Sequence, residues 1–281
     1  MVERFELVKR LLVTFDVEEL DWGRPRAGFV DWDPTSPSAS GLAVILPMIE
    51  KLSLPATFFC TGSFARERPE LLRRLVSEGH EVGSHGMDHR DDYRRLASGV
   101  ACERLAASRN LLEDATGSPI RGVRSPRLAR CLPAVLAEAG FTYDASPHPT
   151  WVGRSIRAAS QPRGPWREEG IVRVPLSVLP ILRMPVAWYV LRFLGARTTA
   201  SMARLSGAGT PWIHLYFHPW EGADLKAQLA PHPLAWRTGP GWIEGLRRLV
   251  SSLAASLPAS TVGDAVDAWL GRRDPASRCV Y

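Results

Sequence analysis

The chain has 281 residues, of which 45% are hydrophobic and 23% are charged. This composition supports a large buried core and excludes a disordered, collagen-like or coiled-coil protein. The 35 basic and 29 acidic residues give a formal net charge of +6, and the basic residues are scattered along the chain. A dedicated nucleic-acid-binding protein would more often concentrate them on one stripe, so no nucleic-acid partner is expected.

Length and targeting signals define the expected class of protein further. The length fits one domain of α/β-barrel size, and we expect a single domain over residues 1–281. The first ten residues mix acids with apolar residues and lack the long apolar run of a secretion signal, so a cytoplasmic location is expected. The four cysteines form no CxxC pair and are expected to be reduced.

The predicted elements alternate between short apolar runs and amphipathic stretches. Strands are predicted at residues 11–15, 55–60, 80–84, 120–124, 141–144, 171–178 and 212–217. Helices are predicted at 40–52, with Ser40 as the N-cap, and at 69–78, 96–116, 132–139 and 242–257. Glycines 79, 117 and 140 are expected to end three of these helices. The alternation predicts a parallel sheet, open or closed.

Two segments have no clear place in this alternation. Residues 145–167 are rich in Pro, Gly, Ser and Arg and are predicted to form a long loop that borders a site. Residues 176–195 are the most apolar stretch, but Arg183, Arg192 and two prolines interrupt it, which argues against a membrane-spanning helix. This stretch is compatible with a buried strand and helix, or with a peripheral contact to a membrane or a polyprenyl-phosphate tail.

Acidic residues follow the first predicted strand, at the strand end where parallel barrels build their sites. The sequence there is Asp16-Val17-Glu18-Glu19. Residues two apart on an extended chain point to the same side, so Asp16 and Glu18 can share a pocket while Val17 packs away from it. A strand end that runs into a solvated acidic turn would give the same pattern.

A pair of histidines follows the third predicted strand, in Gly83-Ser-His85-Gly-Met-Asp-His89. Histidines four apart fall on one face of a helical turn, and this spacing lets both imidazoles reach one metal ion. With a carboxylate they would form the two-histidine, one-carboxylate set of a catalytic zinc site. The pair alone is a weak signal, because surface histidines are common.

Two further motifs end later strands. Arg124 precedes Ser125-Pro126 and is suited to orient a carboxylate through a forked pair of hydrogen bonds, although an ordinary surface arginine would look the same. Strand alternation in 212–218 directs His214, Tyr216 and His218 to one side. His218 is suited to act as an acid near neutral pH, whereas His214 is interpreted as a satisfied interior histidine. Trp220 fits a substrate wall and core packing equally well.

The order of these motifs along the chain indicates a known protein family more specifically than any single motif does. Thr-Phe-Asp-x-Glu, Glu-Val-Gly-Ser-His-Gly-x-x-His, Arg-x-Pro and Phe-His-Pro-Trp-Glu follow one another over most of the chain. This order resembles the polysaccharide deacetylase family, also called carbohydrate esterase family four or the NodB-homology domain. The resemblance implies a distorted (β/α) barrel with about seven parallel strands. It also implies metal-dependent hydrolysis of the N-acetyl group of an amino sugar. The expected substrate is a soluble or lipid-linked glycan precursor, because the first ten residues lack a secretion signal and residues 176–195 are apolar and interrupted by arginines.

The resemblance also implies roles for individual residues. His85, His89 and a carboxylate would hold one divalent metal ion, for which zinc is favoured and cobalt, nickel or manganese would also fit. Asp16 would be the general base, with Arg124 positioning it. His218 would protonate the departing amine.

Several positions depart from the family pattern. The more common motif has a second aspartate as metal ligand where this chain has Val17; alternation favours Glu18 as the ligand, with Glu19 as the alternative. Arg127 stands where an aromatic residue often follows Arg-x-Pro. Tyr216 stands where a leucine commonly lines the acetyl pocket.

The remaining candidates concern the substrate and the rival functions. Asp144 is the candidate acid that tunes His218, and His148 is expected to enter the site from the adjacent loop. Together with Tyr216 and Trp220 they form the expected substrate-binding set. Two other functions stay open: an amidohydrolase that acts on a small non-sugar amide, and a catalytically inactive carbohydrate-binding barrel. The sequence predicts no oligomeric state.

Overall fold

The computed structural model describes residues 9–20, 33–153, 156–226 and 235–273. Cys279 and the N-terminal residues 1–8 lie outside these ranges. The three described cysteines are free, and Cys60 and Cys131 are buried. In the described part of the chain, no helix has both the length and the apolar character needed to cross a bilayer.

Eight strands form one curled sheet in the order β6-β7-β5-β4-β3-β2-β1-β8. The strands are β1 (Arg10–Val17), β2 (Thr57–Cys60), β3 (Glu81–Ser84), β4 (Gly122–Val123), β5 (Tyr143–Asp144), β6 (Trp166–Glu168), β7 (Ile171–Arg173) and β8 (Trp212–Phe217). All neighbouring pairs are parallel except β6 and β7. The predicted sheet of about seven parallel strands is confirmed. Strand β6 was not predicted, because it begins inside the segment that was interpreted as a loop.

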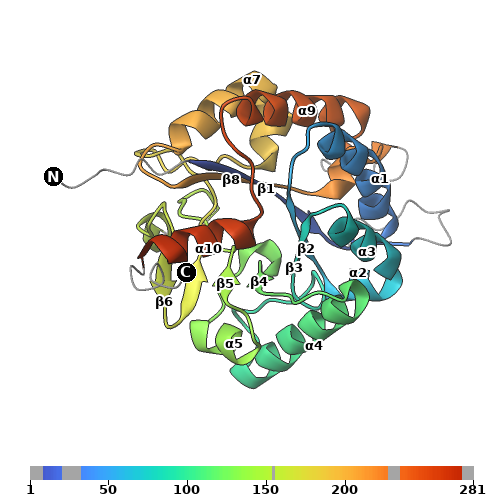
Figure 1. The fold of residues 1–281 in the computed structure, drawn as a ribbon, viewed down its shortest axis with the longest axis vertical. Coiled ribbons are helices and arrows are strands. Elements are labelled where there is room, and N and C mark those ends of the chain that lie inside the picture. The colour runs from blue at the N-terminus through green and yellow to red at the C-terminus, as the bar shows by residue number, and fades with distance from the viewer. Residues whose placement is uncertain (1–8, 21–32, 154–155, 227–234, 274–281) are drawn as a thin grey trace, which may run out of the picture.

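Helices surround the strands (Figure 1). They are α1 (Ser36–Lys51), α2 (Gly62–Glu67), α3 (Pro69–Ser77), α4 (Ser98–Thr116), α5 (Pro133–Glu138), α6 (Ile156–Ala159), α7 (Trp188–Ser206), α9 (Pro240–Ala254) and α10 (Val262–Arg273), with 3-10 turns η1 (Pro126–Leu128) and η2 (Pro219–Gly222). The five predicted helices correspond to α1, α3, α4, α5 and α9. Helix α1 begins at Ser36, so Ser40 lies inside it and is not its N-cap.

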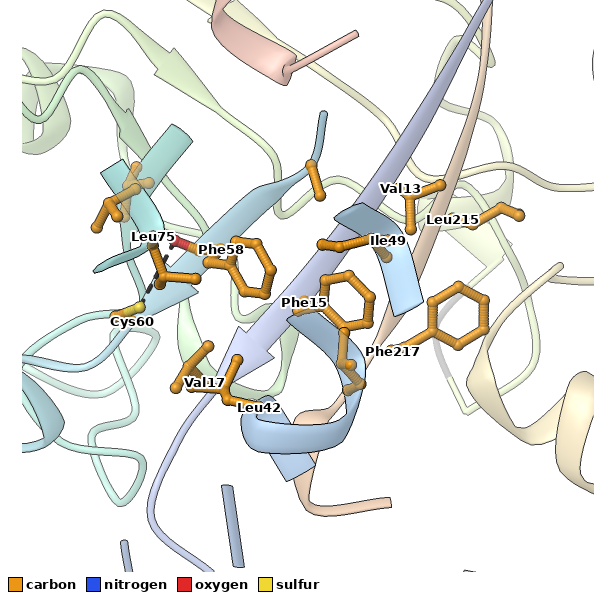
Figure 2. Packing of buried hydrophobic residues seen from close by; sticks show 14 of the residues in the cluster. Val13, Phe15, Val17, Leu42, Ile49, Phe58, Cys60, Leu75, Leu215 and Phe217 are labelled. Atoms are coloured by element: carbon orange, nitrogen blue, oxygen red, sulfur yellow. Dashed lines mark hydrogen bonds between the residues drawn. The ribbon is translucent and has the colours of Figure 1, made fainter. Parts of the chain in front are cut away.

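The main core lies between the outer face of the sheet and the helices. Alternation on β1 turns Val13, Phe15 and Val17 into this core. The rings of Phe15 and Phe58 stack with centroids 5.0 Å apart (Figure 2). Because these apolar residues occupy the outer face, the intervening Thr14 and Asp16 must point into the barrel.

The segment after β7 closes the gap between β7 and β8. The Ser177 N–H donates to the His214 carbonyl at 3.0 Å, and the His214 N–H donates to Ser177 Oγ at 2.8 Å. Residues 171–178, predicted as one strand, are therefore β7 followed by an extended segment that bonds to β8. This contact gives the curled sheet its barrel-like form.

Helix α10 covers the amino ends of the strands. The Val262 N–H donates to Thr57 Oγ1 at 2.9 Å, and the Gly263 N–H donates to Glu81 Oε2 at 2.9 Å. Both acceptors lie at strand starts. The carboxyl ends of the strands therefore form the opposite end of the barrel, where the candidate site lies.

The apolar stretch 176–195 divides between the core and the surface. Leu176, Val178 and Leu191 are buried, whereas Ile181 is 91% and Leu182 is 65% exposed. Phe193 and Leu194 of α7 are also exposed, at 53% and 58%. The interpretation as a buried strand and helix therefore describes only part of this stretch.

Candidate active site

A cavity of about 370 Å³ opens at the carboxyl ends of the strands. Predicted site residues from four separate segments of the sequence line this cavity: Asp16, Glu18, His85, His89, His148, Tyr216 and His218. These segments meet because parallel strands all end at the same edge of the sheet. Arg124 is fully buried behind the cavity, and Asp144 and Trp220 do not line it.

Glu18 and the two histidines form the candidate metal site. His85 Nε2 and His89 Nε2 each lie 3.2 Å from Glu18 Oε2, and one ligand atom from each residue lies within 4.8 Å of the others. All three side chains are buried. Two imidazole nitrogens and a carboxylate oxygen that converge in this way fit the donor set of a divalent transition metal.

Charge favours the same interpretation. Burial raises the pKa of Glu18, but the neighbouring His89, His85 and His218 lower it to about 2. Trp220 Nε1 also donates a hydrogen bond to Glu18 Oε1 at 3.2 Å. The carboxylate is therefore held ionised in a buried position, which is the state that a cation requires.

Glu19 is directed to a different partner. Its Oε1 accepts a hydrogen bond from Thr61 Oγ1 at 2.6 Å, and Thr61 Oγ1 in turn accepts from the Phe64 N–H at the start of α2. Burial raises the pKa of Glu19. Of the two acids that the sequence left open, the structure brings Glu18 to the histidine pair.

The histidine pair does not lie on a helix, contrary to the spacing argument. Residues 85–89 form an irregular loop, in which the backbone of Gly86 has φ +78°. A Cβ on Gly86 would lie 2.7 Å from Tyr93 Oη, so this loop can fold back over the barrel only with glycine here. Tyr93 Oη also accepts a hydrogen bond from the Met87 N–H at 3.2 Å, which fixes the loop.

Arg124 links Asp16 to His214 inside the barrel. Its NH1 donates to Asp16 Oδ1 at 2.7 Å, its NH2 donates to His214 Nε2 at 2.7 Å, and its Nε donates to the Ala145 carbonyl at 3.2 Å. The guanidinium also lies over the Phe59 ring, 4.3 Å from its centroid. Because each of its three guanidinium nitrogens donates one of these hydrogen bonds, Arg124 holds the Asp16 carboxylate in one orientation.

His214 is the neutral residue at the end of this series of hydrogen bonds. Burial lowers its pKa well below the ordinary value, and the charge of Arg124 lowers it further. Nε2 accepts from Arg124, so the ring proton is assigned to Nδ1, which lies 3.2 Å from the Pro175 carbonyl. The interpretation of His214 as a satisfied interior histidine agrees with these contacts.

The acid beside His218 is Glu221, and the expectation for Asp144 is wrong. Glu221 Oε2 lies 3.6 Å from His218 Nδ1 and accepts the His218 backbone N–H at 3.1 Å. Burial lowers the pKa of His218, but Glu221 and Glu18 raise it above its ordinary value. Arg192 NH2 donates to Glu221 Oε1 at 2.8 Å and keeps this carboxylate in place.

Asp144, at the end of β5, binds other residues. Its Oδ1 accepts from the Ser146 N–H at 2.8 Å, and its Oδ2 is paired with Arg173. Glu221 had a sequence signal, because it ends the Phe-His-Pro-Trp-Glu motif three residues after His218. In the tight turn η2, that spacing brings the carboxylate back to the histidine.

Trp220 is also placed differently from expectation. It is fully buried, and its ring stacks on His218 with centroids 5.0 Å apart. The aromatic wall of the cavity is instead formed by Trp188, Tyr189 and Tyr216. Trp188 and Tyr189 lie in the apolar stretch that the sequence pattern related to membranes, so no motif indicated them.

Arg127 and Leu128, in the turn η1, have unusual backbone conformations. Arg127 has φ +54° and Leu128 has φ +52°, a left-handed region that costs such residues of order 1 kcal/mol or more each. Both side chains line the cavity. Strain at adjacent positions of a cavity wall is typical of a site.

The structure is thus a curled parallel barrel with a buried donor set for a divalent cation at the carboxyl ends of its strands. Residues 9–143 match the family model described as polysaccharide deacetylase. This match confirms the resemblance over residues 9–143.

Curated relatives match parts of the same region. A chitooligosaccharide deacetylase of Bradyrhizobium sp. (strain ANU 289) is 32% identical over 141 residues, which are 50% of this chain and 58% of the relative. A peptidoglycan deacetylase of Helicobacter pylori is 32% identical over 108 residues, or 38% of this chain and 36% of the relative. The chain therefore spans little more than half of the one relative and about a third of the other.

Solved structures extend the likeness of fold. A Mycobacterium smegmatis protein assigned to the polysaccharide deacetylases superposes with a TM-score of 0.67 at 18% identity and covers 95% of this chain and 91% of its own. PuuE allantoinase superposes with a TM-score of 0.64 at 16% identity, covering 94% and 90%. The predicted NodB-like barrel is confirmed over nearly the whole chain.

Proposed function

We propose that this protein is a metal-dependent hydrolase that removes the N-acetyl group of an amino sugar in a glycan or glycan precursor. One observation carries the proposal. The same cavity holds a carboxylate–histidine donor set, a carboxylate fixed by an arginine, and a histidine fixed by a second carboxylate. The names of the curated relatives support an amino-sugar amide as the substrate.

Glu18, His85 and His89 would hold one divalent ion, and zinc suits two nitrogen ligands and one oxygen ligand. Such an ion supplies a Lewis acid that lowers the pKa of water and polarises an amide carbonyl. The three side chains are buried around one point. The protein therefore needs little reorganisation when the ion binds.

Asp16 would act as the general base. Arg124 occupies Asp16 Oδ1, so we assign Oδ2 as the atom that takes the proton from the attacking water. The fixed guanidinium stabilises the carboxylate and keeps it aimed into the cavity. Phe59 and the neutral His214 hold the guanidinium from behind.

His218 would act as the general acid. Its Nδ1 faces Glu221, so Nε2 is the atom that we assign to deliver a proton to the leaving nitrogen. The amide C–N bond then breaks, the amine takes this proton, and the acyl group leaves as a carboxylate. The Arg192 ion pair keeps Glu221 from turning away from the histidine.

The cavity wall supports a sugar as the group that carries the amide. Trp188, Tyr189 and Tyr216 present aromatic surface beside the proposed reacting groups. Flat aromatic rings pack well against the apolar face of a pyranose ring while hydroxyl groups point to water. Tyr216 also lies 5.6 Å from the Arg124 guanidinium, measured to the ring centroid.

The decisive experiment combines elemental analysis of the purified protein with a screen for acetate release. We expect one equivalent of a divalent ion, and release of acetate from N-acetylated amino sugars. A parallel set of formyl and ureido compounds tests the amidohydrolase alternative. Turnover of these compounds without turnover of any amino sugar would contradict the proposed substrate class.

Two variants test the roles of the residues. His85→Ala should lose both the metal and the activity, and stoichiometric metal in this variant would exclude the donor set. Asp16→Asn should keep the metal and lose turnover by several orders of magnitude. His80→Asn is the matched control, because His80 lies at the opposite end of β3 and packs on Phe58. It should retain metal and activity.

A further inference from the structure

A second cavity, of about 540 Å³, adjoins the candidate active site. The two cavities share three wall residues, Leu128, His148 and Gly153. The two cavities are therefore direct neighbours, and the metal donor set lines the first of them. A molecule bound for reaction at Asp16 has room to extend into the second cavity.

The floor of this second cavity is a closed ion-pair network. Arg173 is 1% exposed, and it pairs with Asp144 and, at 2.8 Å, with Glu168. Arg130 NH2 also donates to Glu168 Oε1 at 2.8 Å. Both carboxylates of the lining are thus already neutralised by arginines of the same lining.

Positive charge remains after this pairing. Arg94 and Arg157 also line the cavity, so four arginines face two carboxylates there. Arg94 pairs with Asp92, which does not line the cavity. Within the described part of the chain, Arg157 forms no salt bridge, and it projects from α6 with its side chain exposed.

We propose that this second cavity binds an anionic oxygen group, a phosphate or a carboxylate, that is covalently attached to the acylated amino sugar. The inference rests on the proposed function, because it assigns the charge of the substrate at that same site. Arginine suits such a group, since its planar guanidinium can form two parallel hydrogen bonds to two oxygens. The buried Arg173 network makes the floor rigid, and the exposed Arg157 and Arg94 can adapt to the group from the rim.

Charge around the cavities also favours an anion over a neutral glycan. Arg127 extends the positive surface along the first cavity, where it donates to the carbonyls of Arg90 and Asp91. A neutral oligosaccharide has no charge to pair with these cations. An anionic substituent would gain a charge-assisted hydrogen bond from each arginine that it meets.

Binding of product analogues tests the inference without turnover. Calorimetry on the metal-loaded chain compares glucosamine 1-phosphate, muramic acid and glucosamine, none of which carries an acetyl group to remove. We expect one of the two anionic ligands to bind about tenfold tighter than glucosamine, which is the gain from one charge-assisted hydrogen bond. The two anionic ligands carry different groups at different carbons, a phosphate at C1 and a lactyl carboxylate at C3, so the order of their affinities identifies which anion the cavity prefers.

The matched variants are Arg157→Gln and Arg167→Gln. Arg157→Gln should remove most of the preference for the anionic ligand and leave the affinity for glucosamine unchanged. Arg167 lies on β6 between Trp166 and Glu168, which both line the cavity, so alternation directs it away. Arg167→Gln should change nothing. Equal affinities for all three ligands, or an anion preference that survives in Arg157→Gln and in Arg130→Gln, would overturn the proposal.

A kinetic comparison separates this inference from the proposed function. We expect KM for N-acetylglucosamine 1-phosphate or for N-acetylmuramic acid to rise about tenfold in Arg157→Gln, with kcat little changed. If no acylated sugar releases acetate, the proposed function fails, and the calorimetric result still decides whether the cavity binds anions. If all sugars react equally in both proteins, the deacetylase proposal stands and the anion site is refuted.

Discussion

The buried pair of Arg124 and Asp16 gives the sharpest test of how the site is held. The side chains are 0% and 3% exposed, and their atoms lie 2.7 Å apart. Replacing Arg124 by methionine keeps most of the volume but leaves a buried carboxylate without its cation. Breaking such a pair costs about 3–5 kcal/mol of the free energy of unfolding. The loss of the donor to His214 Nε2 adds about 1 kcal/mol.

A double variant separates the interaction between Arg124 and Asp16 from the other effects of each substitution. Asp16→Asn with Arg124→Met removes both charges, so it should be less destabilised than the two single variants predict together. We expect a coupling energy of about 2 kcal/mol. Urea unfolding, followed by tryptophan fluorescence, measures the free energy of unfolding of the parent protein, the two single variants and the double variant.

An exposed pair of the same length is the control. Arg247 and Glu244 also lie 2.7 Å apart, but their side chains are 49% and 42% exposed. Solvent screens such a pair, so its double-mutant cycle should show much weaker coupling. If the coupling of Arg124 with Asp16 is no larger than that of this surface pair, the idea that burial makes Arg124 a rigid holder of the base is refuted.

Three further predictions concern pH, the histidine loop and the surface. Burial and Arg124 lower the pKa of His214 well below 6.5, so the unfolded chain binds a proton that the folded chain does not. The stability from this group is therefore present above pH 6.5 and is lost as the pH falls, by up to about 1.4 kcal/mol per pH unit. Thermal unfolding of His214→Gln between pH 7 and 5 should show a shallower loss than the parent protein, and equal slopes would contradict the assignment. Gly86→Ala should destabilise by about 1–2 kcal/mol, since φ is +78° there, and should weaken metal binding; an unchanged unfolding curve and metal content would show that the loop has another conformation. The side chains of Ile181 and Leu182 are exposed, so the lipid contact stays a prediction. The parent protein should sediment with anionic liposomes at low salt, and the double variant Ile181→Ser, Leu182→Ser should sediment less. No sedimentation of the parent protein would exclude the contact.

The fold followed from short-range patterns that the chain repeats. Alternation in residues 11–15 and 212–217 identified strands whose outer faces are apolar, and glycines 79, 117 and 140 marked the ends of helices. These features depend on backbone geometry within a few residues, so they can be read without the tertiary structure. Helix α7 was predicted only in part, as one interpretation of residues 176–195, and the backbone inside it is not helical at Gly195.

The site was only partly readable for the same reason. Alternation placed Asp16 and Glu18 in one pocket with Val17 outside it, because the relation between residues two apart is fixed by the strand. The histidine pair was found through a helical spacing that the structure does not contain. The imidazoles meet because Gly86 folds the loop back, which brings the ring centroids to 6.1 Å.

The amino-acid sequence by itself determined the parallel sheet, the order of its motifs, and the side of each strand on which a polar residue lies, and the resemblance added the barrel. Only the tertiary structure decided which charges meet: Glu18 and not Glu19 at the histidines, and Glu221 and not Asp144 at His218. The reason is that an ion pair forms over a few ångströms in space, whereas these partners come from loops whose paths are set by packing against distant elements. The sequence fixes the direction of a side chain relative to its own strand, and long-range packing fixes what that side chain reaches.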